Sequence, residues 1–317
     1  MIARLRPLSV RAGARFACVG DGLCCTDVHL LGPVARAERA PIEEARPGAI
    51  VRGRRLAVLA PKDNGHCTFH ADDMRCAIHS SRLLPRSCTR YPFLLAATPT
   101  GARIGTDHRC PCRTMGERPL LRIEDALPSL LDRRGRLSVD RRIEGRIPIE
   151  RRRHVSFTRY EGIEGERLGR ISEPLNLGGK RWQALAWRMD EIARAPTRWG
   201  AMHAAFARGI EAVAERREVV PFARPWAESF ARAAARSVVV RDPEEMLCDW
   251  AADVIWALEW TFSMSLTDAE AEIGLRAEIA RALARSIGTR VDAAMAEAIA
   301  IVEVAGLSED WISFVRQ

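Results

Sequence analysis

Eight of the nine cysteines in this 317-residue chain lie between residues 18 and 112, and Cys248 alone stands apart. A chain of this length buries enough core to be stable without covalent staples. Its first residues, MIARLRPLSVRAGARF, carry scattered arginines and no apolar stretch of the length that a secretory signal has. We therefore expect a cytoplasmic protein, where a reducing environment disfavours disulfides. The clustered cysteines indicate metal binding instead.

The spacing of the eight cysteines is C-x5-C-C, then C-x8-C, then a further Cys after eleven residues, then C-P-C. Thiolates bind soft and borderline metals, and several thiolates meet at one point when turns from separate segments converge. Most zinc sites use pairs two to four residues apart, which this spacing lacks. The adjacent Cys24 and Cys25 project in different directions, as suits two metals or a multinuclear cluster. The predicted cofactor is an iron–sulfur cluster, with zinc as the alternative. The predicted ligands are Cys18, Cys24, Cys25, Cys67, Cys76, Cys88, Cys110 and Cys112.

The remaining cysteine and the four histidines near the cluster also have simpler explanations than metal binding. A lone cysteine in an apolar helical pattern, such as Cys248, is best explained as a core residue. His66, His70, His79 and His108 fall among the cysteines, and for each a surface or supporting position is as compatible with the sequence as a ligand. They stay outside the predicted ligand set, with His66 and His108 the better candidates.

The predicted fold class is α+β, with a small cysteine-rich α+β module followed by an all-α domain. Two β-hairpins are expected at 49–60 and 93–106, and a short helix or turn ends near Pro92. Residues 133–170 hold twelve arginines and six acidic residues, which indicates an exposed connector or a solvated hairpin. The predicted domains are 1–118 for metal binding, 119–175 for the Arg-rich connector and 176–317 for the helices.

Helical periodicity begins at Arg181 and predicts five to seven helices. Asp242-Pro243-Glu244-Glu245 supplies a capping residue, a proline at the first helical position and acids in the first turn. Thr267 with Glu270 predicts a second capping box, and Gly288 a helix end. The most apolar stretch, Met246–Leu266, is interrupted by Asp249, Asp253 and Glu259, so no membrane span is expected.

Charge is divided unequally along the chain. Residues 1–180 hold 33 Lys and Arg against 20 Asp and Glu, and the remainder holds 16 against 21. Almost all the positive charge is Arg, which indicates a base-composition bias, and the acids interleaved with it favour a solvated surface over nucleic-acid binding. The expected partner is a protein that the helical domain recognises.

The cysteine region resembles a known family in FACVGDGLCCTDV, CTFHADDMRCAIHSSRLLPRSCTRYPF and CPC. These segments are similar to the YkgJ-like cysteine-cluster family, described as zinc- or iron-chelating domains. The resemblance covers about residues 14–115. The positions that fit its pattern are Phe16, Cys18, Gly22, Cys24, Cys25, Cys67, Phe69, Cys76, Ile78, Pro85, Cys88, Pro92 and Phe93.

One position departs from the family pattern. Asp21 stands where the family often has its second cysteine. Either its carboxylate serves as the metal ligand in place of that thiolate, or Cys110 or Cys112 supplies the ligand instead. A branch of the family includes flagellin lysine N-methylases, and the resemblance therefore implies protein methylation as an alternative function. A structural zinc scaffold that mediates protein contacts is the third. No glycine-rich nucleotide fingerprint and no C-x3-C-x2-C run accompanies the cysteines.

Overall fold

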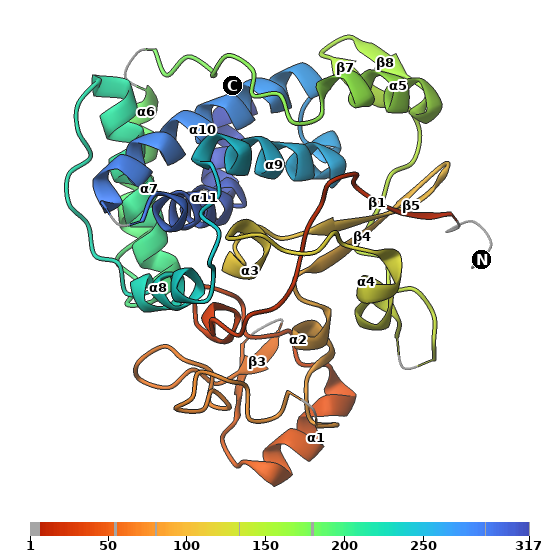
Figure 1. Cartoon of the computed structure of the whole chain (residues 1–317), viewed down its shortest axis with the longest axis vertical. Coiled ribbons are helices and arrows are strands. Elements are labelled where there is room, and N and C mark those ends of the chain that lie inside the picture. The colour runs from red at the N-terminus through yellow and green to blue at the C-terminus, as the bar shows by residue number, and fades with distance from the viewer. Residues whose placement is uncertain are drawn as a thin grey trace.

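The computed structural model describes residues 7–53, 56–79, 81–132, 134–178, 181–288 and 290–316. A small mixed sheet lies between two other parts of the molecule (Figure 1). On one side is the cysteine-containing segment with its short helices and hairpin, and on the other is a bundle of longer helices. The predicted α+β fold with a helical C-terminal part is confirmed.

The sheet has four strands in the order β1-β5-β4-β6. The predicted hairpin at 93–106 is present, with Thr98 opposite Gly101 in an antiparallel pair. Both outer strands pair in parallel with this hairpin, and one of them comes from the Arg-rich range. The strands are β1 (Leu8–Val10), β4 (Phe93–Thr98), β5 (Gly101–Thr106) and β6 (Arg141–Arg142).

The cysteine-containing segment forms the second predicted hairpin, with Ile50 opposite Leu59. Isolated bridges join Thr26 to His66 and His70 to Cys76, so the turns that carry the cysteines lie against one another. Its elements are the 3-10 turn η2 (Leu23–Cys25), α1 (Arg36–Ala45), β2 (Ile50–Arg52), β3 (Ala57–Leu59), α2 (Arg86–Arg90) and α3 (Pro111–Thr114).

Between residues 119 and 175 the chain folds onto both neighbours. Its antiparallel hairpin pairs Ile147 with Val155, and these residues, with Phe157 and Tyr160, are buried in the core of the helical part. The elements here, besides β6, are α4 (Ile123–Leu130), β7 (Ile147–Glu150), β8 (Arg153–Val155) and α5 (Phe157–Arg167).

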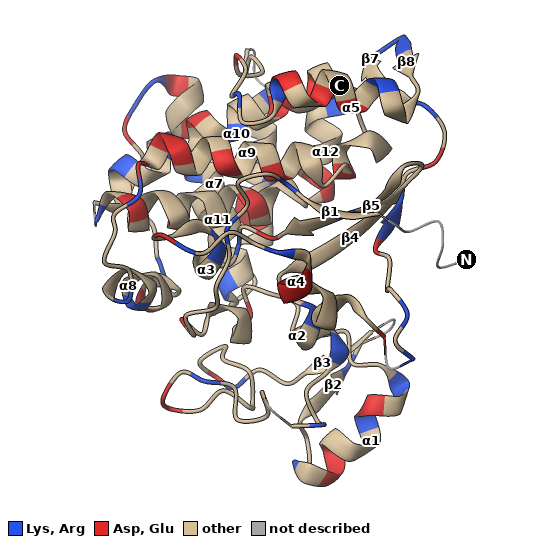
Figure 2. Cartoon of the chain, turned by 45° about the vertical axis from the view of Figure 1, so that its right-hand side comes forward, with Lys and Arg blue, Asp and Glu red and all other residues tan. Residues whose placement is uncertain are grey.

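Within the described residues from 181 onward there are seven α-helices, at the upper end of the expected number. Helices α10 and α11 pack on each other and on α7 in the middle of the bundle. Acidic segments alternate with basic and uncharged ones along these helices (Figure 2). None of the helices within the described ranges is long and apolar enough to cross a bilayer. The helices are α6 (Arg181–Ile192), α7 (Arg198–Glu215), α8 (Ala227–Ala235), α9 (Pro243–Trp256), α10 (Leu266–Ile287), α11 (Val291–Gly306) and α12 (Glu309–Arg316).

Helix boundaries confirm two of the three predicted signals. Asp242 caps α9 and accepts from the backbone N–H of Glu244 and of Glu245, and Gly288 ends α10 in the left-handed conformation. The predicted capping box at Thr267 is wrong, because Ser265 caps α10 with Asp268 as its reciprocal partner. The helix therefore begins two residues earlier than expected.

Candidate metal centre

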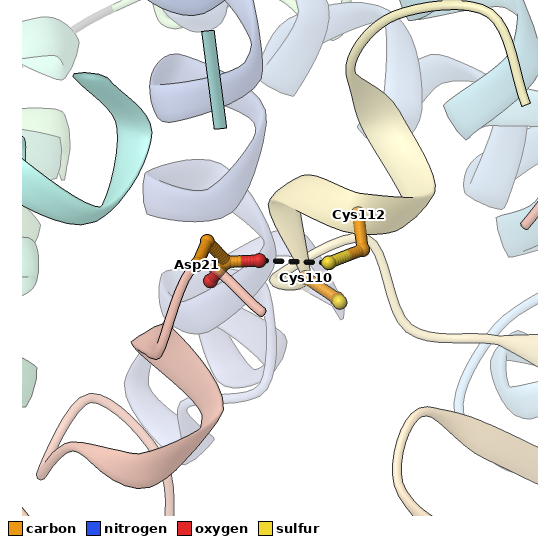
Figure 3. A group of neighbouring side chains, drawn as sticks. All are labelled: Asp21, Cys110 and Cys112. Carbon is orange, nitrogen blue, oxygen red and sulfur yellow. Dashed lines mark hydrogen bonds between the residues drawn. The ribbon is translucent and has the colours of Figure 1, made fainter. Parts of the chain in front are cut away.

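Asp21, Cys110 and Cys112 form a buried group whose ligand atoms all lie within 4.8 Å of one another. Their side chains point toward a common space, Asp21 from the N-terminal segment and the cysteines from either side of Pro111 (Figure 3). The Cys112 thiol donates to the Asp21 carboxylate, with 2.8 Å between Sγ and Oδ2. This carboxylate stands where the family resemblance leads one to expect a cysteine. It therefore joins two of the predicted thiols in a group that could hold a metal ion.

Local backbone geometry presents these groups to one another. Cys110 is the N-cap of α3 and Pro111 its first helical residue, so the two thiols flank the start of this short helix. Opposite them, Gly22 has a φ of 82°, and a Cβ there would lie 2.9 Å from Nε2 of His70. Only glycine accommodates both this conformation and this close approach. The Asp21 side chain accepts from the backbone N–H of Leu23, which holds the turn closed.

Cys18 belongs to the same group. Its thiol interacts directly with Cys112, and the N–H of the next residue, Val19, donates to Cys112 Sγ at 3.1 Å. Arg236, at the end of α8, donates to the carbonyl oxygen of Gly20 at 2.8 Å and so fixes this loop from the helical part. Cys18 thus lies beside Cys112, at the edge of the group that Asp21, Cys110 and Cys112 form.

The pKa values of this group show what it costs to ionise without a counter-charge. The contact with Cys112 raises the pKa of Cys18, and the contact with Cys110 raises that of Cys112. Burial raises the pKa of Asp21. Closely spaced acids cannot all lose their protons unless a positive charge lies among them. A bound cation would supply that charge, so this donor set could hold a metal ion.

A second group gathers the other five cysteines. Sγ of Cys24 lies 4.0 Å from Sγ of Cys25, and Cys25 also contacts Cys76. The backbone N–H of Cys67 donates to the carbonyl of Cys25, which joins the two segments. Cys67 and Cys88 lie within electrostatic range of Cys76, in a small apolar core.

The thiols of the second group differ in acidity. The contact with Cys25 lowers the pKa of Cys76 to about 6. The contact with Cys24 raises the pKa of Cys25. Burial raises the pKa of Cys67 and brings that of Cys88 to about 12. Cys76 therefore ionises more readily than Cys25, Cys67 or Cys88.

The four histidines take different places. His66 and His70 contact each other, with 3.1 Å between their Nδ1 atoms, and His79 lies near Cys76. His108 binds Asp253 through Nε2 at 2.9 Å.

A buried charge network connects the first cysteine group to the helical part. Arg113, which follows Cys112, has no exposed side-chain surface and binds Asp249 at 2.6 Å and Asp253 at 2.7 Å. Arg11, which directly follows β1, binds the carboxylates of both Asp249 and Asp253. In the sequence, Asp249 and Asp253 stand out only as interruptions of an apolar helix. Their i, i+4 spacing places both on one face of that helix, and this is the signal that could have indicated a buried basic partner such as Arg113.

Comparison of the chain with protein-family models, with characterised proteins and with solved structures finds no match. The resemblance to the YkgJ-like family accordingly stays a prediction.

Proposed function

We propose that this protein binds metal at two places in its cysteine region. The observation that carries the proposal is the close convergence of Asp21, Cys110 and Cys112. Around one tetrahedral ion with metal–sulfur bonds of about 2.3 Å, neighbouring ligands lie about 3.8 Å apart. Ligand atoms within 4.8 Å of one another match a single ion, either zinc or iron. Cys18 contacts Cys112 but lies outside this 4.8 Å group, so it would have to move closer to complete four ligands.

The second group suits a larger cofactor. Although its thiols are neighbours, no three of them have sulfurs that all lie within 4.8 Å of one another, since only the first group meets that condition among the described Cys, His, Asp and Glu residues. A wider ring of thiolates fits a cluster whose own sulfide ions fill the centre. We therefore assign an iron–sulfur cluster to this group. Its ligands would be four of Cys24, Cys25, Cys67, Cys76 and Cys88.

Anaerobic purification followed by absorbance, iron, zinc and sulfide analysis tests both assignments. The protein should be brown and hold inorganic sulfide together with a further metal ion. Cys76→Ser should abolish the sulfide-to-iron absorbance and leave the single ion. Cys112→Ser should remove the single ion and leave the absorbance.

The matched control is Cys248→Ser, because this thiol lies on α9, far along the chain from both groups. It should retain full metal content. A colourless protein with zinc alone would reject the cluster, and unchanged metal content in both test variants would reject the two sites.

Methylation and the zinc-scaffold role both stay predictions from sequence. Transfer of methyl groups from a labelled donor to proteins of a cell lysate is the direct assay for the first. For the second, metal removal should abolish binding to a protein partner while the helical part stays folded.

A further inference from the structure

A cavity of about 250 Å³ lies between the sheet and the helical part, and no cysteine lines it. Strands β4 and β5 and the segment after β5 form one side, and helices α9, α10, α11 and α12 form the other. Much of the wall is apolar, from side chains such as Leu94, Ile273 and Trp311. Glu259 and Leu307 also line it and are exposed, so the cavity opens to the surface there. Its volume equals that of about eight water molecules at about 30 Å³ each, which suits a ligand with few heavy atoms.

Five carboxylates line this cavity, and they differ in how closely a guanidinium group neutralises them. For Glu303 the paired guanidinium nitrogen is Nη1 of Arg276, at 3.5 Å, and Arg276 forms a closer pair with Glu272 at 2.5 Å. Glu303 is therefore the carboxylate of this wall whose charge is offset least. The other four each have an arginine nitrogen within 3.0 Å, and they are Asp107, Asp253, Glu259 and Glu272.

Glu303, on α11, also has one oxygen available for a ligand. Its Oε2 accepts from the indole N–H of Trp250 at 2.6 Å, whereas Oε1 has no hydrogen-bond or ion-pair partner among the described residues. The side chain is 19% exposed although it lies deep between the sheet and the helices. Burial raises the pKa of Glu303 in spite of Arg276. A positive charge beside Oε1 would offset the cost of ionising this carboxyl group.

His108 provides a second unused acceptor in the same wall. Its Nε2 lies 2.9 Å from Oδ2 of Asp253 and must donate there, because a carboxylate only accepts. Asp253 already binds Arg11 and Arg113, so its charge is matched without a charged imidazole. In the neutral ring Nδ1 is an acceptor, and this atom is buried without a hydrogen-bond partner. Buried polar atoms are nearly always paired, which indicates a missing donor.

The positive groups of the wall are engaged elsewhere. Arg109 donates to Asp107 through Nε and Nη2, and Arg141 pairs with an exposed carboxylate of the wall at 3.0 Å. The two free atoms identified above, Oε1 of Glu303 and Nδ1 of His108, both accept, and their residues lie within electrostatic range of each other. A metal ion does not suit them, since among the described residues only the first cysteine group brings three ligand atoms close enough together. The ligand must therefore be an organic cation with N–H donors.

We propose that this cavity binds a small primary ammonium ligand with a short apolar body, through Glu303 and His108. The ammonium group has three donors, which serve Oε1 of Glu303 and Nδ1 of His108, and its charge offsets that of the carboxylate. The apolar body packs against the apolar part of the wall. This site goes beyond metal binding and does not require that either metal be bound.

Calorimetric titration of the full-length protein with butylammonium tests the site, with the metal content of the protein measured. Saturable binding is expected, and butanol and butyrate, which have a similar size without the positive charge, should bind at least about tenfold more weakly. Glu303→Gln should weaken butylammonium binding about tenfold or more, as the loss of a hydrogen bond between charged groups implies. The amide keeps an oxygen that accepts from Trp250.

The matched control is Glu297→Gln. Glu297 lies on the same helix, α11, and likewise accepts from an indole N–H, that of Trp226. It does not line the cavity, and Arg224 pairs with it at 2.6 Å. This variant should bind butylammonium as the wild type does.

Three results would overturn the proposal: no saturable binding of butylammonium, equal binding by Glu303→Gln and wild type, or equally tight binding of butanol or butyrate. Leu307→Lys gives a second reading if Glu303→Gln is poorly folded. Leu307 is 48% exposed where the cavity opens, so the variant should fold, and the added charge should weaken binding of the cation. An unchanged affinity would count against the site. Butylammonium binding by protein that holds no metal would support this site and refute the metal proposal, so the two fail separately.

Discussion

Replacement of Asp253 by Asn tests whether buried charges fasten the cysteine region to the helical bundle. Asp253 is 3% exposed and accepts from Arg113, from Arg11 and from His108. Burial alone would raise its pKa, but Arg113 and its other neighbours outweigh burial and hold the pKa well below its usual range. The variant keeps the shape of the side chain and removes the charge that two buried guanidinium groups share.

The expected loss of stability is large. Removing one partner of a buried ion pair costs about 3–5 kcal/mol, because the remaining charge is left uncompensated. With an unfolding entropy of about 2.1 cal/mol/K per residue, a loss of this size lowers the Tm of a chain of this length by roughly 5–7 °C.

The effect has a defined pH dependence. A carboxyl group whose pKa is lowered in the folded state stabilises the protein above its unfolded pKa of about 4, and this contribution is lost as the pH falls through the folded value. The difference between wild type and Asp253→Asn should therefore be constant from about pH 8 to pH 5 and shrink below about pH 4.

Urea unfolding followed by tryptophan fluorescence measures the change, since all eight tryptophans lie beyond residue 180. Glu228→Gln is the control, because Glu228 pairs with Arg232 on the surface and is 66% exposed. It should unfold like the wild type. Asp253→Asn should also lose the metal of the first group more readily, since Arg113 follows Cys112 directly. A change below about 1 kcal/mol, or one equal to that of the control, would refute the buried network.

Two further predictions concern packing and titration. Gly209→Ala would place a methyl group 2.6 Å from Cγ2 of Ile279 and should destabilise the protein by about 1–3 kcal/mol in urea unfolding. Its control is Gly165→Ala, which has nothing within 4 Å and should stabilise the protein by about 0.5–1 kcal/mol. Equal effects of the two variants would contradict the packing of α7 on α10. Burial raises the pKa of Tyr91 and of Tyr160, the only tyrosines. The folded protein should therefore show no phenolate absorbance step near pH 10, and its stability should fall above the unfolded tyrosine pKa of about 10. A step before unfolding would contradict this burial.

Local signals in the sequence predicted the hairpins and two helix boundaries, at Asp242 and Gly288, because turns and caps depend on neighbouring residues. The start of α10 shows where such signals fail. Ser265 with Asp268 and Thr267 with Glu270 are both valid capping boxes, two residues apart. In the structure Thr267 donates instead to the carbonyl of Ile149, 118 residues away. A long-range contact thus determines which of the two locally equivalent capping boxes begins α10.

The sequence indicated which residue types would make up the candidate site, but not how these residues are arranged in space. Spacing singled out eight cysteines as candidate ligands, but their division into two groups depends on which distant turns meet in space. Asp21 was recognised as a departure, and the structure brings it to Cys112. The cavity at His108 and Glu303 had no sequence signal, since a buried orphaned atom is visible only once the fold surrounds it.

The two groups share one short loop, and this has an energetic consequence. Cys18 and Asp21 belong to the first group, whereas Cys24 and Cys25, on the turn that follows, belong to the second. A metal bound at either place must fix this loop, and the conformational entropy lost there need not be lost again at the other. The proposed sites should therefore bind cooperatively. Cys112→Ser should release iron to a chelator faster than Cys248→Ser does, although Cys112 is no ligand of the cluster, and equal release rates would show that the loop is ordered before either metal binds.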